Sequence, residues 1–212
     1  MTEPSSNAVT LPSYTTDTPT SDADADALAR LIFQAGDGMF EFMFGAGERG
    51  YRNLARLIQL DGNSFARRYI QPLYADGQIQ GMANYFLPAE IDKKAENDDY
   101  AQAFSLPAQL LLGAKSLLLW PVGGLDQIDG MYIQTLAVDP STRGQGYGSR
   151  LLAHVFADAR ARHIVSVWLD VDIHNPNAKR LYERVGFEVQ ETRRFPFVNL
   201  GVYRMRKPID SD

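Results

Sequence analysis

Apolar residues recur along the chain with two different spacings, and these spacings predict where its helices and strands lie. Residues 146–163 place Leu151, Leu152, Val155 and Phe156 on one face at helical spacing. Three further helices are expected at 27–35, 49–59 and 176–185, the first of them capped by Asp22, Asp24 or Asp26 and stopped near Gly36. Strand-like runs, several with period-two alternation, cover residues 66–75, 78–86, 131–138, 164–173, 187–193 and 202–206.

The order of these elements indicates one mixed α/β domain. Asp76-Gly77 separates the first two strands, and this dipeptide is typical of a tight β-hairpin. The strand, helix and strand over residues 131–173 predict a single parallel crossover of right-handed connection. We therefore expect a largely antiparallel sheet with helices on both faces, and a functional site near the crossover.

Two apolar segments do not fit this simple alternation. Residues 38–45 are rich in Phe and Met between glycines, and they either fill the core or line a substrate site. Residues 91–127 form a helical insertion, whose stretch from Leu106 to Trp120 is too apolar to leave in water. We expect this stretch to pack over the acceptor side of the sheet beside the aromatic segment, with a homodimer contact as the alternative.

Composition narrows the class of protein. The 212 residues include no cysteine, which excludes disulfides, thiolate metal sites and cysteine nucleophiles. Residues 1–26 carry five acids and no base, lack the pattern of a signal peptide and are expected to be a flexible tail, which leaves residues 27–212 as a single domain. No apolar run is long enough to span a membrane, so a cytoplasmic location is expected.

Charge gives no indication of a polyanionic partner. The net charge is −5, and because the first 26 residues hold five of the 26 acids, the rest of the chain is neutral. We therefore expect neither nucleic acid nor an anionic membrane as a partner. A basic excess near the C-terminus, between Lys179 and Lys207, is either a solvated face or an anion-binding region.

Three alternating glycines follow the strand that ends at Val138. Gly144, Gly146 and Gly148 let the backbone turn tightly into a helix, whose first amides and dipole favour a phosphate. The spacing matches neither the dinucleotide fingerprint, because position 149 is Ser, nor the Walker pattern, because no Gly-Lys-Ser/Thr occurs. A phosphate ligand of another kind is therefore indicated.

This segment resembles the acetyl-CoA motif of the GNAT superfamily of N-acetyltransferases, Gln/Arg-x-x-Gly-x-Gly/Ala, here residues 143–148. A second motif of that family is present as Asn175, Ala178, Leu181, Tyr182, Gly186 and Phe187. The resemblance covers residues 131–189 and implies acetyl transfer from acetyl-CoA to the primary amine of a small molecule or peptide, by direct attack in a ternary complex. The insertion at 91–127 departs from the family pattern, so the resemblance implies nothing about the acceptor site of this chain.

The resemblance also implies roles for individual residues. Tyr182 is expected to protonate the departing thiolate, and the strand amides of Leu136, Ala137 and Val138 to form an oxyanion hole. Asn175 is implied in cofactor binding, although it is also a good N-cap before Pro176. The remaining cofactor contacts are expected from the glycine turn, namely Arg143, Gly144, Gln145, Gly146, Tyr147, Gly148 and Ser149.

The base that deprotonates the amine is left open among Glu41, Glu90, Asp172, His174 and a chain of water molecules. Three histidines without metal-ligand spacing support no metal site. The alternative to an enzyme is a non-catalytic acyl-CoA-binding or interaction module on the same fold, against which the presence of Tyr182 argues.

Overall fold

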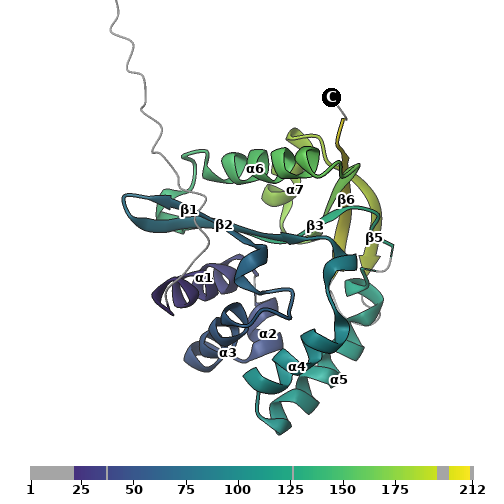
Figure 1. Ribbon diagram of the computed structural model, residues 1–212. Coiled ribbons are helices and arrows are strands. Elements are labelled where there is room, and N and C mark those ends of the chain that lie inside the picture. Colours follow the sequence, from purple (N-terminus) through teal and green to yellow (C-terminus); the bar gives the residue numbers. More distant parts are fainter. Residues whose placement is uncertain (1–21, 37, 126, 195–200, 211–212) are drawn as a thin grey trace, which may run out of the picture.

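The computed structural model describes residues 22–36, 38–125, 127–194 and 201–210, with all their side chains except those of residues 118–123. Its centre is a six-stranded sheet in the order β1-β2-β3-β4-β6-β5. Figure 1 shows α6 and α7 on one face of this sheet and α1 to α5 on the other. The strands are β1 Ile70–Ala75, β2 Gln78–Phe86, β3 Met131–Val138, β4 Ser166–Asp172, β5 Glu188–Arg194 and β6 Gly201–Pro208.

The helices follow the predicted order, with α2 as an addition. They are α1 Asp22–Ala35, α2 Met39–Phe44, α3 Gly47–Gln59, α4 Lys93–Ala103, α5 Leu106–Gly123, α6 Tyr147–Ala161 and α7 Pro176–Arg184. Only β3 and β4 pair in parallel, and all other neighbouring strands pair antiparallel. The predicted fold class, a mostly antiparallel sheet covered by helices on both faces with one parallel crossover, is confirmed.

The hairpin between β1 and β2 has the geometry that Asp76-Gly77 predicts. Asp76 and Gly77 both have positive φ, 52° and 71°, as a type I′ turn requires. The first predicted strand begins four residues late, because residues 67–69 form a turn of 3-10 helix before β1.

The tail boundary at residue 26 is corrected. Asp22 and the four residues after it belong to the first turns of α1, and the Asp22 carboxylate accepts a hydrogen bond of 2.9 Å from Gln59 Nε2 of α3. Acidic side chains near a helix N-terminus are stabilised by the helix dipole. The acidic residues that suggested a tail therefore form the start of a helix. Residues 1–21 lie outside the described part of the chain.

Two hydrophobic cores lie on opposite faces of the sheet. The core under α6 joins that helix to Met131, Ile133, Val167 and Met205 of the strands. The core on the other face contains α1, α3 and an aromatic cluster in which Phe33, Phe40, Phe44, Phe65 and Phe104 contact one another. Core filling is therefore the role of Phe40 and Phe44, whereas Phe42 is 43% exposed.

The insertion forms the helical hairpin α4–α5 and is fastened to the domain at its first helix. The Asp99 carboxylate accepts hydrogen bonds from the Gly62 amide (2.6 Å) and from Asn63 Nδ2 (2.9 Å). In α5, Leu112 is buried in the same core as Phe44, and the Lys115 ammonium contacts the carbonyl oxygen of Phe42. Packing beside the aromatic segment is therefore confirmed for this side of α5.

The other side of α5 contradicts the expectation that the leucine-rich stretch is buried. Leu106, Leu110 and Leu117 are 68%, 70% and 77% exposed, and Leu111 is 56% exposed. Apart from Gln109, Lys115 and Ser116, residues 106–117 are apolar, so the helix has a wider apolar surface than the side that the domain covers.

Candidate active site

The two central strands separate partway along their length. β3 pairs with β4 only over Met131–Ile133 and Val167–Leu169, and beyond that point β4 pairs with β6 alone. The separation begins where the β2–β3 register shifts, since Asn84 lies opposite Thr135 but Tyr85 lies opposite Ile133. Gln134 is thus an extra residue on β3, and such a bulge bends a strand. We call the resulting gap at the carboxyl ends of β3 and β4 the strand opening.

The glycine turn borders the strand opening on the β3 side. Gly144 and Gly146 have φ values of +83° and +81°, a backbone conformation that glycine adopts without strain. A Cβ atom on either would meet nothing within 4 Å, and Gly146 caps α6 without a side-chain hydrogen bond. The turn thus presents bare backbone to its surroundings.

The first turn of α6 offers hydrogen-bond donors for an anion. Arg150 donates its amide to Gly146 (3.1 Å), so the amides of Tyr147, Gly148 and Ser149 precede the first intrahelical bond. The side chains of Arg143, Gln145 and Ser149 are exposed at this turn, whereas the Tyr147 ring is buried in the core. Any contact of Tyr147 with a ligand in the turn is therefore limited to its backbone.

One cation beside the turn was absent from the predicted set. The Arg150 guanidinium lies 5.5 Å from the centre of the Tyr147 ring, in the first turn of α6. Arg150 follows Tyr147 by three residues, and residues at this spacing are neighbours on a helix surface. This spacing could have indicated from the sequence that Arg150 lies beside the turn.

The amides at the end of β3 point in two directions. Residues in an antiparallel ladder alternate between hydrogen-bonded and non-hydrogen-bonded pairs. Asp139 donates its amide to Gln80 (2.9 Å), so the alternation directs the amide of Ala137 at Met82 and those of Leu136 and Val138 away from β2. Ala137 is therefore removed from the predicted oxyanion hole, while Leu136 and Val138 face the strand opening.

Tyr182 borders the opposite side, on the helix that follows β4. Its ring packs edge-on against Phe187 at 5.7 Å, and its hydroxyl has no hydrogen-bond partner within the described residues. Burial raises the pKa of the Tyr182 hydroxyl to about 12, because the phenolate loses more hydration than the phenol. The hydroxyl is thus protonated at neutral pH.

Asn175 has a structural role at the start of α7. Its Oδ1 accepts a hydrogen bond of 3.0 Å from the Ala178 amide, and Pro176 occupies the first helical position. The capping role weighed in the sequence is confirmed, and a cofactor contact of Asn175 stays a prediction.

Glu90 is separated from this site by the length of α6. It forms an ion pair of 2.6 Å with Arg162, just beyond the C-terminus of that 15-residue helix, about 22 Å from the glycine turn. A polar cavity of about 500 Å³, lined by Tyr85, Glu90 and Arg162 among others, lies at the same far end. The prediction that Glu90 is a candidate base is therefore wrong.

The other candidate bases differ in their hydrogen bonds and in their exposure. Asp172 Oδ1 accepts the amide of His174 (2.7 Å) in the turn after β4, and the His174 side chain is exposed. Glu41 Oε2 is buried and makes no hydrogen bond within the described residues. These three residues stay candidates.

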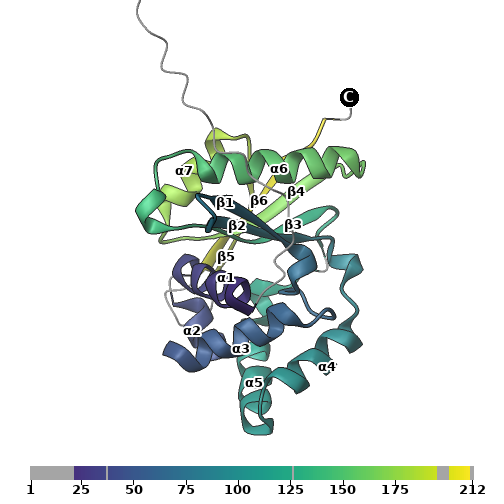
Figure 2. The same cartoon turned by 60° about the vertical axis from the view of Figure 1, so that its left-hand side comes forward.

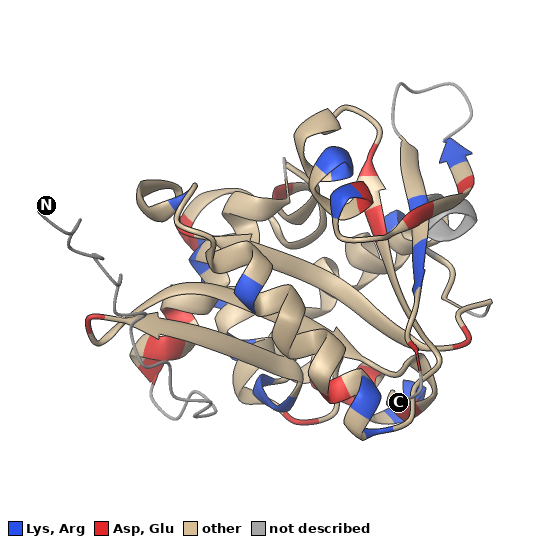
Figure 3. Ribbon diagram, turned by 90° about the horizontal axis from the view of Figure 1, so that it is seen from above, with Lys and Arg blue, Asp and Glu red and all other residues tan. Residues whose placement is uncertain are grey.

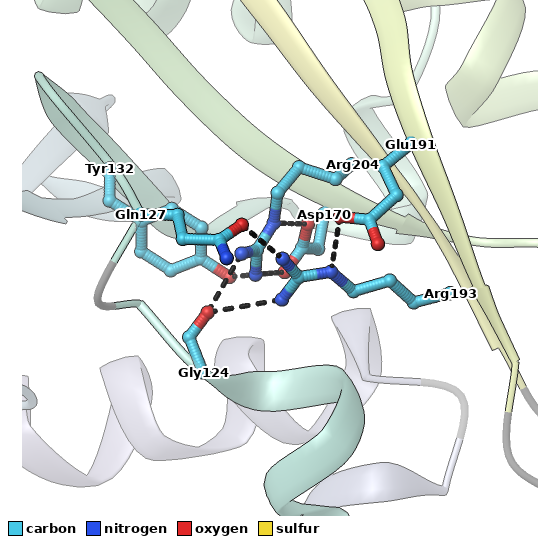
Figure 4. A network of polar contacts seen from close by, with 7 residues as sticks. All are labelled: Gly124, Gln127, Tyr132, Asp170, Glu191, Arg193 and Arg204. Atoms are coloured by element: carbon cyan, nitrogen blue, oxygen red, sulfur yellow. Dashed lines mark hydrogen bonds and ion pairs between the residues drawn. The ribbon is translucent and has the colours of Figure 1, made fainter.

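A buried ion pair lies at the base of the strand opening (Figure 4). Asp170 follows Leu169, the last residue of β4 that pairs with β3, and Arg204 grips its carboxylate with two hydrogen bonds of 2.8 and 2.6 Å. The Tyr132 hydroxyl donates to the same carboxylate (3.2 Å). Arg204 and Arg193 both donate to the Gly124 carbonyl oxygen, which ties the end of α5 to the sheet.

Removing one partner of this ion pair should destabilise the protein. We expect Arg204→Ala to lower the free energy of unfolding by about 3 kcal/mol, because it leaves the buried Asp170 carboxylate without its counter-ion. Urea denaturation measures this. The exposed pair of Arg30 and Glu48 is the control, and Arg30→Ala should cost under about 1 kcal/mol. Equal losses in the two variants would contradict the prediction.

The basic excess near the C-terminus is partly paired. Lys179 bonds Glu183, Arg193 bonds Glu191 and Arg204 bonds Asp170. Viewed from above, basic and acidic residues are interspersed over α6, α7 and the strands (Figure 3). The described residues contain no group of three or more His, Asp or Glu that could hold a metal ion, and no helix long and apolar enough to cross a membrane.

Comparison with known families decides the identity of this arrangement. Residues 39–187 match the model of the acetyltransferase (GNAT) family. The chain belongs to this family. The match spans the aromatic segment, the strand opening, the glycine turn and α7, so the predicted resemblance is confirmed.

Individual relatives are more distant from this GNAT protein. A ribosomal protein bS18-alanine N-acetyltransferase from Haemophilus ducreyi is 40% identical over 60 residues, 28% of this chain and 41% of that protein. The chain thus spans about two fifths of the length of that curated relative. The crystal structure of the ribosomal-protein-S18-alanine N-acetyltransferase from Escherichia coli matches with a TM-score of 0.56 at 18% identity, over 94% of this chain and 96% of that one.

A third structure, the PaiA N-acetyltransferase of Thermoplasma acidophilum in complex with coenzyme A, has a TM-score of 0.52 at 12% identity. The match covers 92% of this chain and 99% of that one. At these identities the two structures show a shared fold.

Proposed function

We propose that the protein transfers an acetyl group from acetyl-CoA to a primary amine, by direct attack of the amine in a ternary complex. The observation that carries this proposal is the strand opening, which has free backbone donors on one side and a protonated tyrosine on the other. Such an opening at the carboxyl ends of parallel strands is where α/β proteins bind ligands.

The glycine turn fits the pyrophosphate of acetyl-CoA. The positive φ of Gly144 and Gly146 directs bare backbone at the ligand, and the first amides of α6 add donors at the positive end of the helix dipole. Arg143 and Arg150 add positive charge beside these amides. The rest of the substrate would then extend along the free edge of β3 into the opening.

The chemistry requires one bond to form and one to break. The amine nitrogen attacks the thioester carbonyl carbon, the carbon–sulfur bond breaks, and the thiolate takes up a proton as the nitrogen loses one. The amides of Leu136 and Val138 would stabilise the negative charge that develops on the carbonyl oxygen. Tyr182 would supply the proton to sulfur, since its hydroxyl is protonated at neutral pH.

Four side chains and solvent are candidates for the group that accepts the proton of the amine. Asp170 joins Glu41, Asp172 and His174, because it is the first residue of β4 beyond the paired stretch. Its carboxylate accepts two hydrogen bonds from Arg204 and lies at the strand opening. Glu41→Gln, Asp170→Asn, Asp172→Asn and His174→Ala, compared by kcat against pH, separate a base from a water chain.

The names of several relatives support a choice of first acceptor. They are ribosomal protein bS18-alanine N-acetyltransferases, and the nitrogen that an alanine offers for acetylation is its α-amine, so we propose the α-amine of a peptide as the first acceptor to examine. Lysine side chains, polyamines and aminoglycosides complete the panel.

Release of free thiol from acetyl-CoA tests the function. We expect release with at least one amine of the panel to exceed the background without acceptor. Tight binding of acetyl-CoA with no acceptor-dependent release from any amine would favour the non-catalytic module instead.

The pH dependence of kcat tests the assignment of Tyr182. A proton donor works in its protonated form, so activity that depends on it is lost as the pH rises through its pKa. Because that pKa is raised to about 12, we expect kcat to show no decline between about pH 8 and pH 10. Circular dichroism at each pH checks the fold. A decline with a midpoint near 10 in folded protein would contradict the prediction.

Phe42 tests whether the aromatic segment shapes the acceptor site. We expect Phe42→Ala to raise the KM for the acceptor severalfold and to leave the Kd for CoA unchanged, because its half-exposed ring lies on the face of the sheet opposite α6. The same effect is expected of Trp120→Ala, whose side chain lies outside the described set. Ala157→Ser, on the exposed face of α6, is the control. A changed Kd for CoA with an unchanged acceptor KM would refute this role.

A further inference from the structure

The outward face of α5 is apolar along its described length. Leu106, Pro107, Leu110, Gly113, Ala114 and Leu117 are all exposed, and at 100° per residue they fall within about 120° of arc. A surface helix normally turns polar residues to water. This face has none, and a continuous apolar patch on a folded domain indicates an interaction surface.

The position of α5 leaves this face accessible. Figures 1 and 2 both show the α4–α5 hairpin at the end of the molecule farthest from α6. The opposite side of the helix is the one fastened to the domain, through buried Leu112 and through Lys115. The apolar face therefore points away from the core that its own chain provides.

We propose that this face binds the same face of a second copy of the chain, with the two α5 helices antiparallel. The described residues of the face carry no charge, so it lacks a group to pair with a charged partner. Its four central residues, Leu110, Gly113, Ala114 and Leu117, are arranged symmetrically about a point between Gly113 and Ala114. In an antiparallel pair centred there, Leu110 meets Leu117 of the second copy, and the two small residues meet at the crossing.

The small residues matter because they allow close approach. A Cβ atom on Gly113 would meet nothing within 4 Å in the monomer, so the domain itself does not require glycine there. At a crossing of two helices, small side chains let the neighbouring leucines interdigitate. A two-fold axis makes one such patch sufficient for both partners.

The available area predicts how stable the dimer is. The exposed parts of Leu106, Leu110, Leu111 and Leu117 amount to on the order of 400 Å² of apolar surface per molecule. Burying them in both copies removes about 800 Å², which is below the roughly 1,200 Å² of a stable specific interface and corresponds to a weak, transient one. We therefore expect a concentration-dependent dimer that dissociates in the micromolar range.

Single-cysteine variants test the arrangement directly, because the chain has no native cysteine. In the proposed pair the two copies of residue 113 lie about one residue apart along the helix axis, whereas the two copies of Leu106 are about 22 Å apart. A disulfide requires Cα atoms within about 7 Å. Mild oxidation should thus cross-link Gly113→Cys and leave Leu106→Cys without a cross-link. Equal cross-linking of both variants, or of neither, would overturn the antiparallel pair.

Sedimentation velocity of the full chain tests self-association. We expect the dimer to be lost in Leu110→Glu/Leu117→Glu and kept in Gln102→Glu, an exposed position of α4. Gly113→Leu distinguishes close packing from general stickiness, because it enlarges the apolar face yet should weaken the dimer. A chain that stays monomeric up to about 100 μM, or one that stays monomeric and binds neutral phosphatidylcholine vesicles, would overturn the proposal. None of these readouts depends on acetyl transfer.

Discussion

We expect Gly148→Glu to abolish measurable binding of CoA while the protein stays folded. Gly148 lies in the first turn of α6, and a Cβ atom there would make ordinary contacts of 3.8 and 3.9 Å with Leu136 and Val138. The backbone therefore accepts a side chain at this position. The added carboxylate would lie beside the amides that we assign to the pyrophosphate, and the repulsion between the two anions acts across a short distance.

Calorimetry measures this effect, with Ala157→Glu as the matched control. Ala157 is exposed on the same helix, so the control adds the same charge to α6 about 14 Å from the turn. Gly146→Glu should also abolish binding, but its φ of +81° adds strain and makes it a less clean variant. Arg143→Ala should weaken binding less than either, because backbone amides supply most of the contact. Near-native affinity in Gly148→Glu would remove the glycine turn as the binding site.

The second large effect is expected from Tyr182→Phe. Loss of the hydroxyl should lower kcat by about 10²- to 10⁴-fold with little change in the Kd for CoA, if it supplies the proton to the departing sulfur. The ring keeps its contact with Phe187 at 5.7 Å, and the described residues offer no hydrogen bond to the hydroxyl, so folding should be unaffected.

Tyr69→Phe is the control for this variant. Tyr69 is a partly buried tyrosine that packs against Phe86 at 5.6 Å, near the cavity at the far end of α6. We expect its kcat to equal that of the native protein. An unchanged kcat in Tyr182→Phe, measured with a good acceptor, would remove Tyr182 from the reaction.

The sequence predicted most of the fold because its local signals agreed with one another. Asp76-Gly77 determined a hairpin through positive φ, and the alternating apolar positions of residues 131–138 matched β3. The glycine turn and the motif beginning at Asn175 were also predicted. Their conformations depend on contacts between residues that are near one another in the sequence.

The features that the sequence did not predict depend on contacts between distant segments. The ion pair of Asp170 with Arg204 joins residues 34 apart, and no periodicity marks either of them. Glu90 remained a candidate base until its partner Arg162 placed it at the far end of α6. The leucines of α5 are exposed although burial was expected, because the apolar surface of this helix is wider than the side that the domain covers.

Transfer of an isotope-labelled acetyl group from acetyl-CoA tests whether the amine attacks acetyl-CoA directly. The protein is incubated with labelled acetyl-CoA and a peptide that has a free N-terminus, and mass spectrometry locates the label. Direct attack by the amine predicts label on the peptide amine, none on the protein, and no transfer by Gly148→Glu. Label retained on the protein as an intermediate, or transfer by Gly148→Glu at the native rate, would contradict it.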